Sequence, residues 1–369
     1  MRIAVITNMP RDHQVEFLGA ISKEPACDIH VFFLCRLTHG RQWAEHLEPD
    51  FPHTFVPMLP VHNAVYLNFG LLPALRRFKP DLVILGQYAN VAMQMTMYYA
   101  SMARVPWVLW TEPAGVKYSD KPLLKSERTR LWLRRLALLP PRRWAREIWA
   151  ISDLAQQQYS DMTEAPCHRL DYYSDLSRFL AIKREGFEHP VRFLCSGSLS
   201  FRKGIDLVAE AVRRLAEAKI AFTITFMGDG PLLSDVEDLR NDFPDQVSIA
   251  GFKEIAEVAG VLAQHDVLVT PSRYDGWGMV VPEALAAGMP VVATNAMGAA
   301  SEMVDTGVNG HLIEALSSDA LFRAMLALAK NPGAIFAMGL EARRTAKQFS
   351  AEVGARRFAA LAQSACEPP

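Results

Sequence analysis

Two adjacent cations and a glycine mark one loop that could bind a phosphate group. Residues 193–204 predict a strand, then a loop with Gly197, Ser198, Arg202 and Lys203, and then a helix. A loop that opens onto a helix N-terminus presents free backbone N–H groups and the positive end of the helix dipole. Arg202 and Lys203 would add two full positive charges, which suits a diphosphate. Adjacent basic residues at a helix start are more often simply solvated, so this motif alone leaves both readings open.

A second stretch, residues 271–294, places two carboxylates around a glycine turn. Asp275 falls in a predicted loop, and Glu283 lies within two helical turns of it, so both can face one ligand. Glycines at Gly276 and Gly278 allow positive φ angles and a close approach of the backbone to a phosphate or sugar. Glu283 stands in an almost wholly apolar run, where an unpaired carboxylate is costly, and this favours a functional role. Asp275 could also be a turn residue, because Asp-Gly is a common turn pair.

The elements that must position these residues follow an alternating pattern. Short apolar runs alternate with longer amphipathic runs, which predicts parallel βα units and an α/β fold. A chain of 369 residues is long enough for about two domains. The predicted strands are residues 2–7, 29–35, 81–86, 107–111 and 147–151 in the first half, and 191–196, 222–227, 247–249, 267–270, 291–294 and 310–313 in the second.

A stretch without clear periodicity, residues 171–190, predicts the linker between the two domains. We therefore expect an N-terminal domain over residues 1–174 and a second domain over residues 175–348. The remaining residues, 349–369, predict a helix that returns to the first domain.

Composition excludes several classes of protein. The chain is 50% hydrophobic and 21% charged with a net charge of −1, which is typical of globular proteins and excludes disordered and collagen-like chains. Five scattered cysteines without a Cys-x-x-Cys pair predict reduced thiols in the cytoplasm and argue against a structural zinc site. The first residues read as a strand, so we expect no secretion signal. Polar residues interrupt the uncharged stretch 82–103, which we interpret as a strand and a helix, not a membrane span.

The segment 117–147 is strongly basic, with ten basic residues against three acidic ones, and it is interleaved with Leu and Trp. This pattern is typical of a helix that lies on an anionic membrane surface. A solvated helix whose leucines face their own core explains it equally well. Peripheral association with the inner face of a membrane is therefore an expectation that rests on this segment.

An ordered set of short motifs runs through residues 191–313. Its members are Gly228-Asp229-Gly230-Pro231, Asp266-Val267, Pro271-Ser272, Asp275, Trp277-Gly278, Glu283-Ala284, Gly288, Pro290 to Thr294, Gly298, Ser301-Glu302 and Gly307-x-x-Gly310. This set resembles the retaining, nucleotide-sugar-dependent glycosyltransferases of family 4, also called group 1, which have the GT-B fold. The first half of the chain matches that family only in architecture.

The resemblance implies two Rossmann-like domains that face each other across a cleft, with the acceptor bound by the first and the nucleotide sugar by the second. It implies that Glu283 holds the ribose hydroxyls and that Asp275 contacts hydroxyls of the transferred sugar. The backbone amides around Trp277, Gly278 and Met279 would cradle the distal phosphate.

By the same resemblance, Arg202 and Lys203 would neutralise the pyrophosphate leaving group, where negative charge grows as the glycosidic bond to phosphate breaks. Relatives need no divalent metal in the site, and this chain has no Asp-x-Asp motif. The implied reaction moves a sugar from a nucleotide diphosphate sugar, with a UDP-sugar favoured, to a glycan or lipid-linked acceptor. The anomeric configuration is retained, no separate cofactor is used, and surface polysaccharide or glycoconjugate synthesis is the expected setting.

Some positions depart from the family pattern or extend it. Asp275 stands where relatives usually have Glu, and Ser198 where many have Arg. Glu112 follows the strand 107–111, where relatives often place a His near the sugar, so it is a candidate for a polar role toward donor or acceptor. Phe252 follows a strand at about the place where relatives hold the base.

Three alternatives stay open. A nucleotide-sugar epimerase could share the two-domain architecture. A dinucleotide-dependent dehydrogenase would also read as two Rossmann-like halves, but no Gly-x-Gly-x-x-Gly follows the first strand. A degenerate transferase could bind a nucleotide sugar or a partner without turnover. The sequence contains no signal for nucleic-acid binding.

Overall fold

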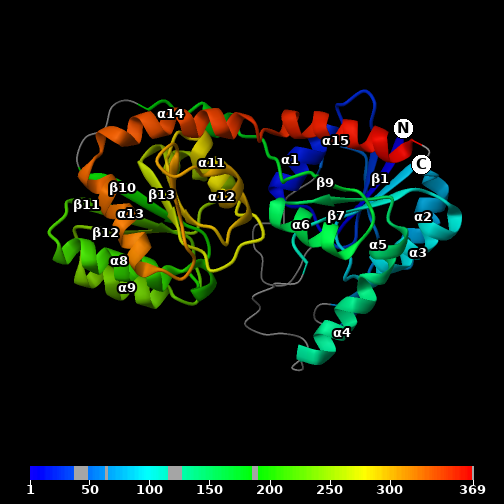
Figure 1. The fold of residues 1–369 in the computed structure, drawn as a ribbon, viewed down its shortest axis with the longest axis horizontal. Coiled ribbons are helices and arrows are strands. Elements are labelled where there is room, and N and C mark those ends of the chain that lie inside the picture. Colours follow the sequence, from blue (N-terminus) through cyan, green and yellow to red (C-terminus); the bar gives the residue numbers. More distant parts are fainter. Residues whose placement is uncertain (37–48, 63–64, 115–126, 185–189, 368–369) are drawn as a thin grey trace. The chain divides into compact units, whose positions relative to one another are not determined.

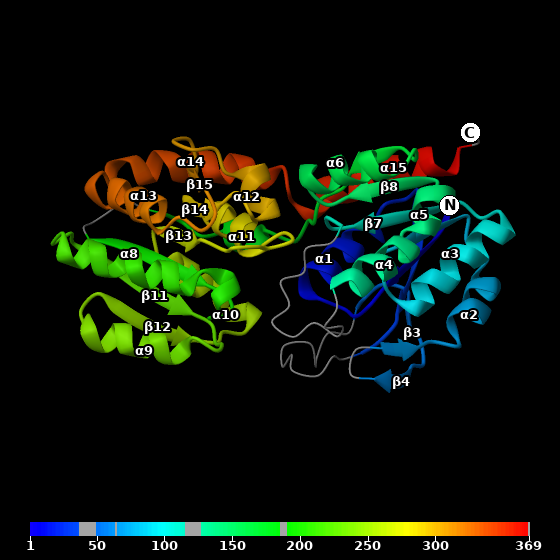
Figure 2. The same ribbon diagram turned by 60° about the horizontal axis from the view of Figure 1, so that its bottom comes forward.

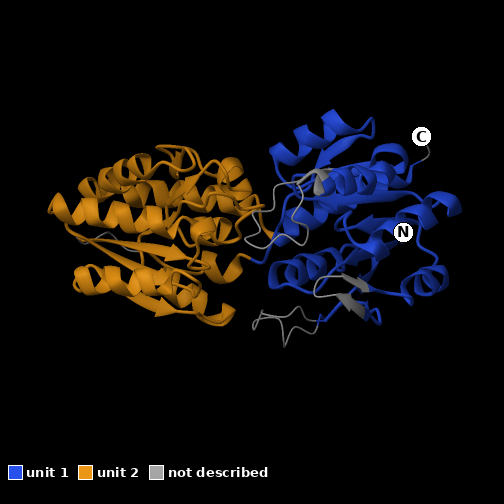
Figure 3. Cartoon of the chain, turned by 90° about the horizontal axis from the view of Figure 1, so that it is seen from below, with its two compact units in different colours: residues 1–175, 351–369 blue, residues 176–350 orange. Residues whose placement is uncertain are grey.

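The protein consists of two compact units, which we describe from a computed structural model. The structure describes residues 1–36, 49–62, 65–114, 127–184 and 190–367 (Figure 1). Unit 1 contains Met1–Asp175 together with Ala351–Pro369, and unit 2 contains Leu176–Ser350 (Figure 3). The chain therefore passes from unit 1 into unit 2 and back again.

Unit 1 is built on a parallel sheet of seven strands in the order β3-β2-β1-β6-β7-β8-β9. Its central strands are almost wholly buried, as the apolar runs predict, because helices cover both faces of such a sheet. The strands are β1 (Arg2–Thr7), β2 (Asp28–Phe33), β3 (His53–Phe55), β6 (Leu82–Leu85), β7 (Trp107–Thr111), β8 (Glu147–Ala150) and β9 (Cys167–Arg169), and a separate antiparallel pair is formed by β4 (Leu59–His62) and β5 (Val65–Leu67).

The helices of unit 1 include one from the far end of the chain. Helix α15 packs against α1, and its Gly354 has no room for a side chain, because a Cβ there would lie 2.7 Å from Cε2 of Phe17. Asn90 caps α3 by accepting a hydrogen bond from the Ala92 N–H (2.8 Å). The helices are α1 (Asp12–Ile21), α2 (Leu71–Phe78), α3 (Val91–Ala103), α4 (Glu127–Ala137), α5 (Leu139–Trp144), α6 (Asp153–Met162) and α15 (Ala351–Cys366).

Unit 2 has a parallel sheet of six strands in the order β12-β11-β10-β13-β14-β15. The strands β11 and β12 are added on one side of β10, and β13, β14 and β15 are added on its other side. Strands β10 and β13 therefore flank the topological switch point. Loops at the carboxyl ends of the strands diverge there, which is where α/β sheets bind ligands. The strands are β10 (Val191–Ser196), β11 (Phe222–Met227), β12 (Val247–Gly251), β13 (Val267–Thr270), β14 (Val291–Thr294) and β15 (Gly310–Ile313).

The helices of unit 2 enclose an apolar core that includes residues from β10, β11, β13, α8 and α13. The two sheets and their helices confirm the predicted α/β class. No helix in the described part of the chain is long and apolar enough to cross a membrane. The helices of unit 2 are α7 (Ser177–Leu180), the 3₁₀ turn η2 (Phe201–Lys203), α8 (Ile205–Glu217), α9 (Leu233–Asp242), α10 (Ile255–Ala263), α11 (Val280–Ala286), α12 (Gly298–Met303), α13 (Ser318–Lys330) and α14 (Gly333–Lys347).

Candidate functional site

The loops that follow β10 and β13 pack on each other at the switch point of unit 2. Gly204 ends η2 with φ at +74°, and a Cβ on it would collide with the carbonyl oxygen of Pro271. The Arg273 N–H donates a hydrogen bond to the carbonyl oxygen of Arg202 (2.8 Å). Only glycine combines this backbone conformation with this close approach, so Gly204 fixes the turn that carries the two cations.

Four of the predicted residues come together here. Lys203 Nζ lies 2.5 Å from Oδ2 of Asp275, and Arg202 Nη1 lies 3.6 Å from the same oxygen. Arg202 also donates to the carbonyl oxygen of Tyr274 (2.9 Å). Gly197 lies beside the ammonium group, since a Cβ on it would be 3.7 Å from Lys203 Nζ, and its φ of +123° favours glycine at this position.

The charge state of Asp275 follows from these neighbours. Burial alone would raise the pKa of its carboxyl group. The opposite charge of Lys203, its hydrogen bond, the charge of Arg202 and a hydrogen bond from the Trp277 amide outweigh burial and hold the pKa below its usual value. Asp275 is therefore ionised at neutral pH and offsets part of the positive charge of the loop.

The lowered pKa of Asp275 predicts a stability effect in acid. A carboxyl group with a depressed folded-state pKa stabilises the fold above its unfolded pKa, and this contribution is lost as the pH falls through the folded value. We expect Asp275→Asn to lower the melting temperature at pH 7 and the deficit to shrink below about pH 4. Thermal unfolding at a series of pH values checks this, and a deficit that is the same at pH 3 and pH 7 would contradict the ion pair.

A second ion pair, which the sequence analysis missed, holds the cation-bearing turn. The Arg273 guanidinium donates to both carboxylate oxygens of Asp206 (2.7 and 2.6 Å) and to the carbonyl oxygen of Phe201 (2.6 Å). It also lies 3.6 Å above the Phe201 ring. Asp206 is in the first turn of α8, and Arg273 is 7% exposed. The only signals for this pair in the sequence were an acidic residue two positions after Gly204 and a basic residue two positions before Asp275.

The loop from Gly276 to Met279 connects Asp275 to α11. Gly278 has φ at +95°, and Met279 precedes the first residue of α11. Trp277 is 3% exposed and its ring packs against Phe349, with ring centroids 6.4 Å apart. The Trp277 side chain is therefore a packing residue of the loop. The roles predicted for the backbone amides of this loop stay predictions.

Glu283 lies in the middle of α11 and is half-buried. Its neighbours Pro282 and Ala284 are buried, as the apolar run predicts. Two further predicted residues lie at the same carboxyl edge of the sheet. Ser198 is exposed in the loop after β10, and Phe252 directly follows β12 with 48% of its surface exposed.

Glu112 belongs to unit 1, at the carboxyl end of β7, and is not part of the cluster in unit 2. Tyr172 donates a hydrogen bond from its hydroxyl to Oε1 of Glu112 (3.2 Å), and its ring meets His13 edge-on at 5.1 Å. Burial and the neighbouring Glu112 raise the pKa of Tyr172 well above its usual value. Burial and the charge of Arg11 lower the pKa of His13 to about 3, so this imidazole is neutral.

Tyr172 and His13 were not predicted as site residues. Tyr172 falls in the stretch read as linker, although it directly precedes Tyr173, a fully buried residue of unit 1. No three His, Cys, Asp or Glu side chains within the described ranges are grouped so that they could hold a metal ion.

The basic segment 117–147 lies partly outside the described residues, which resume at residue 127. Its described part forms α4 and α5. The reading in which its leucines face their own core holds for Leu138, which is buried. It fails for the exposed apolar residues Trp132, Leu133, Leu136, Leu139 and Trp144.

The second half of the chain is similar in sequence to known proteins. Residues 190–331 match the family model described as "Glycosyl transferases group 1". An uncharacterized glycosyltransferase of Methanocaldococcus jannaschii is 32% identical over 158 residues, which are 42% of this chain and 43% of that protein. Alpha-D-kanosaminyltransferase of Streptomyces kanamyceticus is 26% identical over 62% of this chain and 55% of its own length. The matched region thus spans about half the length of these curated relatives.

Solved structures match over the whole chain. HepE of Anabaena in complex with UDP has a TM-score of 0.75 at 18% identity and covers 99% of this chain and 100% of its own. The lipopolysaccharide outer core galactosyltransferase WaaB has a TM-score of 0.70 at 15% identity, covering 98% of this chain and all of its own. At such identities the likeness shows the fold. Together with the match of residues 190–331 to the family model, it shows that this segment belongs to the group 1 glycosyltransferases and that the chain has the GT-B fold.

Proposed function

We propose that this protein transfers a sugar from a nucleotide diphosphate sugar, with UDP favoured as the nucleotide, to a glycan or lipid-linked acceptor, with retention of anomeric configuration. The observation that carries the proposal is the cluster of Arg202, Lys203 and Asp275 at the switch point of unit 2. It lies inside the segment that matches the family model. The solved complex of HepE with UDP supports a uridine nucleotide.

The chemistry assigned to the cluster is charge stabilisation. As the bond between the sugar and the phosphate breaks, negative charge grows on the leaving diphosphate, and fixed cations stabilise that charge most where water is excluded. Lys203 is 13% exposed and Arg202 32% exposed, so both charges are partly desolvated. Asp275 orients the Lys203 ammonium group and, in the proposal, also contacts the donor sugar. Glu283 would hold the ribose.

Unit 1 supplies the acceptor site in this proposal. Glu112, with the Tyr172 hydroxyl bound to it and the neutral His13 beside that ring, offers hydrogen-bonding groups to a sugar hydroxyl. Five free cysteines support a reducing, cytoplasmic setting. One relative, from Salmonella typhimurium, is named as a glycosyltransferase of colanic acid biosynthesis, and this supports a role in surface polysaccharide synthesis.

Nucleotide binding tests the donor site directly. We expect one nucleoside diphosphate among UDP, GDP and ADP to raise the melting temperature, because a ligand that binds only the native state stabilises it by about 2.7 kcal/mol at one hundred times its Kd. Glu283→Ala should abolish that shift, with CMP and NAD serving as comparison ligands. Glu237→Ala, which removes an exposed glutamate of α9, is the matched control and should leave the shift unchanged.

The outcomes separate the alternatives. Stabilisation by NAD would favour a dehydrogenase, and a nucleotide shift that survives Glu283→Ala would show that the residue assignment is wrong. Nucleotide binding without release of UDP from a UDP-sugar, in the presence of candidate acceptors, would favour a degenerate binder. Interconversion of sugars without transfer would favour an epimerase.

A further inference from the structure

A shallow pocket of about 660 Å³ opens at the edge of unit 1 opposite to Glu112. Its walls come from residues that precede β7, β8 and β9 and from the end of α15, so it lies at the amino ends of the strands. Glu112 lies at the carboxyl end of β7. The pocket is therefore separate from the groups that the proposed function assigns to unit 1.

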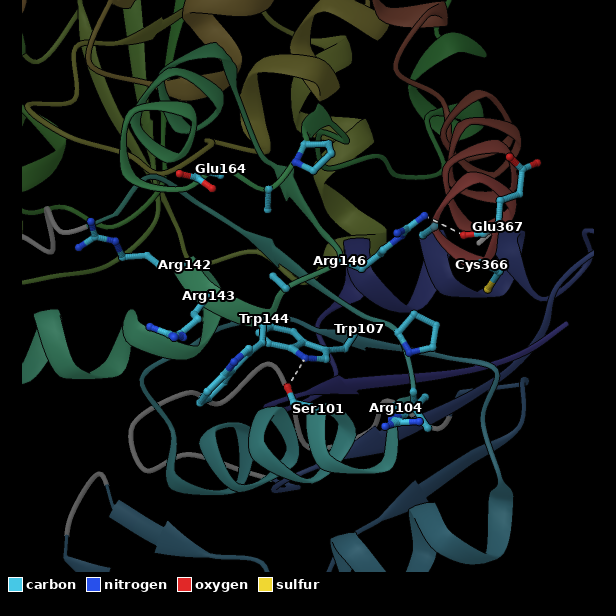
Figure 4. Close-up of a pocket in the computed structure, with 16 residues that line it drawn as sticks. Ser101, Arg104, Trp107, Arg142, Arg143, Trp144, Arg146, Glu164, Cys366 and Glu367 are labelled. Carbon is cyan, nitrogen blue, oxygen red and sulfur yellow. Dashed lines mark hydrogen bonds between the residues drawn. The ribbon is translucent and has the colours of Figure 1, made fainter. Parts of the chain in front are cut away.

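Arginines line this pocket on two sides of an aromatic centre. Figure 4 shows Arg104 on one side of Trp107 and Trp144, and Arg142 and Arg143 on the other. All three arginines are exposed, and none has a carboxylate within ion-pair distance among the residues described.

Other groups in the pocket reduce the positive charge without removing it. Arg146 donates to the backbone carbonyl oxygen of Glu367 (2.7 Å) and so keeps its charge. Glu164 and Glu367 are the acidic residues among those that line the pocket. Four guanidinium groups against two carboxylates leave an excess of positive charge.

An apolar stripe leads along α3 to this pocket. Val91, Met95, Tyr98 and Met102 are 40, 48, 44 and 79% exposed, and their spacing of four, three and four residues places them on one face of the helix. Helix α3 carries no charged residue. Tyr98 packs on Trp144 with ring centroids 5.4 Å apart, which joins the stripe to the pocket. The helices that carry the two residues, α3 and α5, lie side by side (Figure 2).

We propose that this surface, made of the α3 stripe and the arginine-lined pocket and called here the α3–α5 face, binds the surface of an anionic phospholipid membrane. Arg104, Arg142 and Arg143 would pair with lipid phosphates, which guanidinium groups bind bidentately. Tyr98, Trp144 and Met102 would lie at the boundary between headgroups and acyl chains, where amphipathic aromatic rings are favoured. Because its cations surround an aromatic centre, the face suits several headgroups better than one soluble phosphate.

This inference deepens the membrane association that the segment 117–147 predicts: it keeps Arg142, Arg143 and Trp144 from the end of that segment and adds residues outside it. The sequence pattern concerns the whole segment 117–147, whose described part forms α4 and α5. The structure adds Arg104 and the exposed stripe of α3, a helix that the sequence analysis considered only as part of a membrane span and rejected as one. The proposal does not depend on which sugar is transferred.

Vesicle co-sedimentation tests the α3–α5 face. We expect the full chain to bind vesicles with 30% phosphatidylglycerol in phosphatidylcholine, to bind pure phosphatidylcholine far more weakly, and to release from the anionic vesicles as salt is raised. R142Q/R143Q should weaken binding about 30-fold, because each basic residue near such a surface contributes roughly a factor of five. Met102→Gln should weaken it further without altering net charge.

Matched variants make the test specific. R76Q/R77Q removes two adjacent, exposed arginines from α2 of the same unit and should leave binding within about three-fold. Equal losses in both double variants would overturn the proposal, since net charge alone would then explain binding. Loss in W132S/L133S without loss in R142Q/R143Q would assign the contact to α4 and also overturn it.

A titration with a soluble phosphate ester distinguishes a lipid surface from a site for a free phosphate. A rise in melting temperature with millimolar glycerol 3-phosphate that disappears in R142Q/R143Q would identify a soluble-phosphate site and overturn the lipid assignment. The UDP-induced shift, measured on the same double variant, should be unchanged. Loss of vesicle binding with an intact UDP shift therefore separates this inference from the proposed function.

Discussion

Lys203→Gln is expected to lower kcat/KM for sugar transfer by about 100- to 1000-fold. Removing one group that stabilises developing negative charge in a desolvated site typically costs that much. Lys203 is only 13% exposed, and its ammonium group is fixed by Asp275 at 2.5 Å, so no reorganisation is needed as the charge develops. The release of nucleoside diphosphate from the donor that the wild type turns over measures the effect.

The variant also changes Asp275. With the Lys203 charge removed, burial would raise the pKa of Asp275 closer to its usual value or above it. We expect the remaining activity to fall as the pH is lowered toward that pKa, more steeply than in the wild type. Lys330→Gln, at the exposed end of α13, is the matched control and should keep full activity. A Lys203→Gln enzyme with more than a third of wild-type activity would refute charge stabilisation by this residue.

Gly204→Ala is expected to destabilise unit 2 by about 2–5 kcal/mol. A left-handed backbone conformation costs a residue with a Cβ about 1–2 kcal/mol, and the collision with the Pro271 carbonyl adds about 1–3 kcal/mol as the loops move apart. For a unit of this size, the melting temperature should fall by roughly 5–15 °C. Differential scanning calorimetry checks the shift, with the transition of unit 1 as an internal reference.

Gly260→Ala is the control for this prediction. Gly260 lies in the interior of α10, and a Cβ there would meet no atom within 4 Å. Because glycine weakens a helix interior by up to about 1 kcal/mol relative to alanine, this change should be neutral or slightly stabilising. If both alanine variants unfold at the wild-type temperature, the close packing of the two loops at Gly204 is wrong.

The buried strands of both units could be predicted from the sequence, because a strand covered on both faces is a continuous apolar run. The predicted ranges 2–7, 107–111 and 191–196 match β1, β7 and β10 residue for residue. Two edge strands of unit 1 were missed. His53–Phe55 and Cys167–Arg169 are three residues long and only partly buried, so the residues themselves carry little apolar pattern. Whether such a short segment forms a strand depends on its pairing with a sheet that has already formed.

The candidate site could be predicted in part. The loops with Arg202, Lys203 and Asp275 were identified, but the hydrogen bond from Lys203 to Asp275 joins residues 72 positions apart. No local rule says which loop of a sheet faces another. The pair formed by Asp206 and Arg273 was missed for the same reason, since each residue alone looks like an ordinary surface charge. Pairings of this kind follow from strand order, which becomes visible only in the folded sheet.

The return of α15 to unit 1 has a consequence for synthesis of the chain. Phe17 and Tyr173 pack against Gly354 of α15, so part of the core of unit 1 stays uncovered until residues 351–366 have been made. All of unit 2 is translated in that interval. N-terminal domains usually fold first during translation. In this protein, unit 1 cannot complete its core before unit 2 has been translated. Unit 2 can therefore finish folding before α15 is available to pack on unit 1.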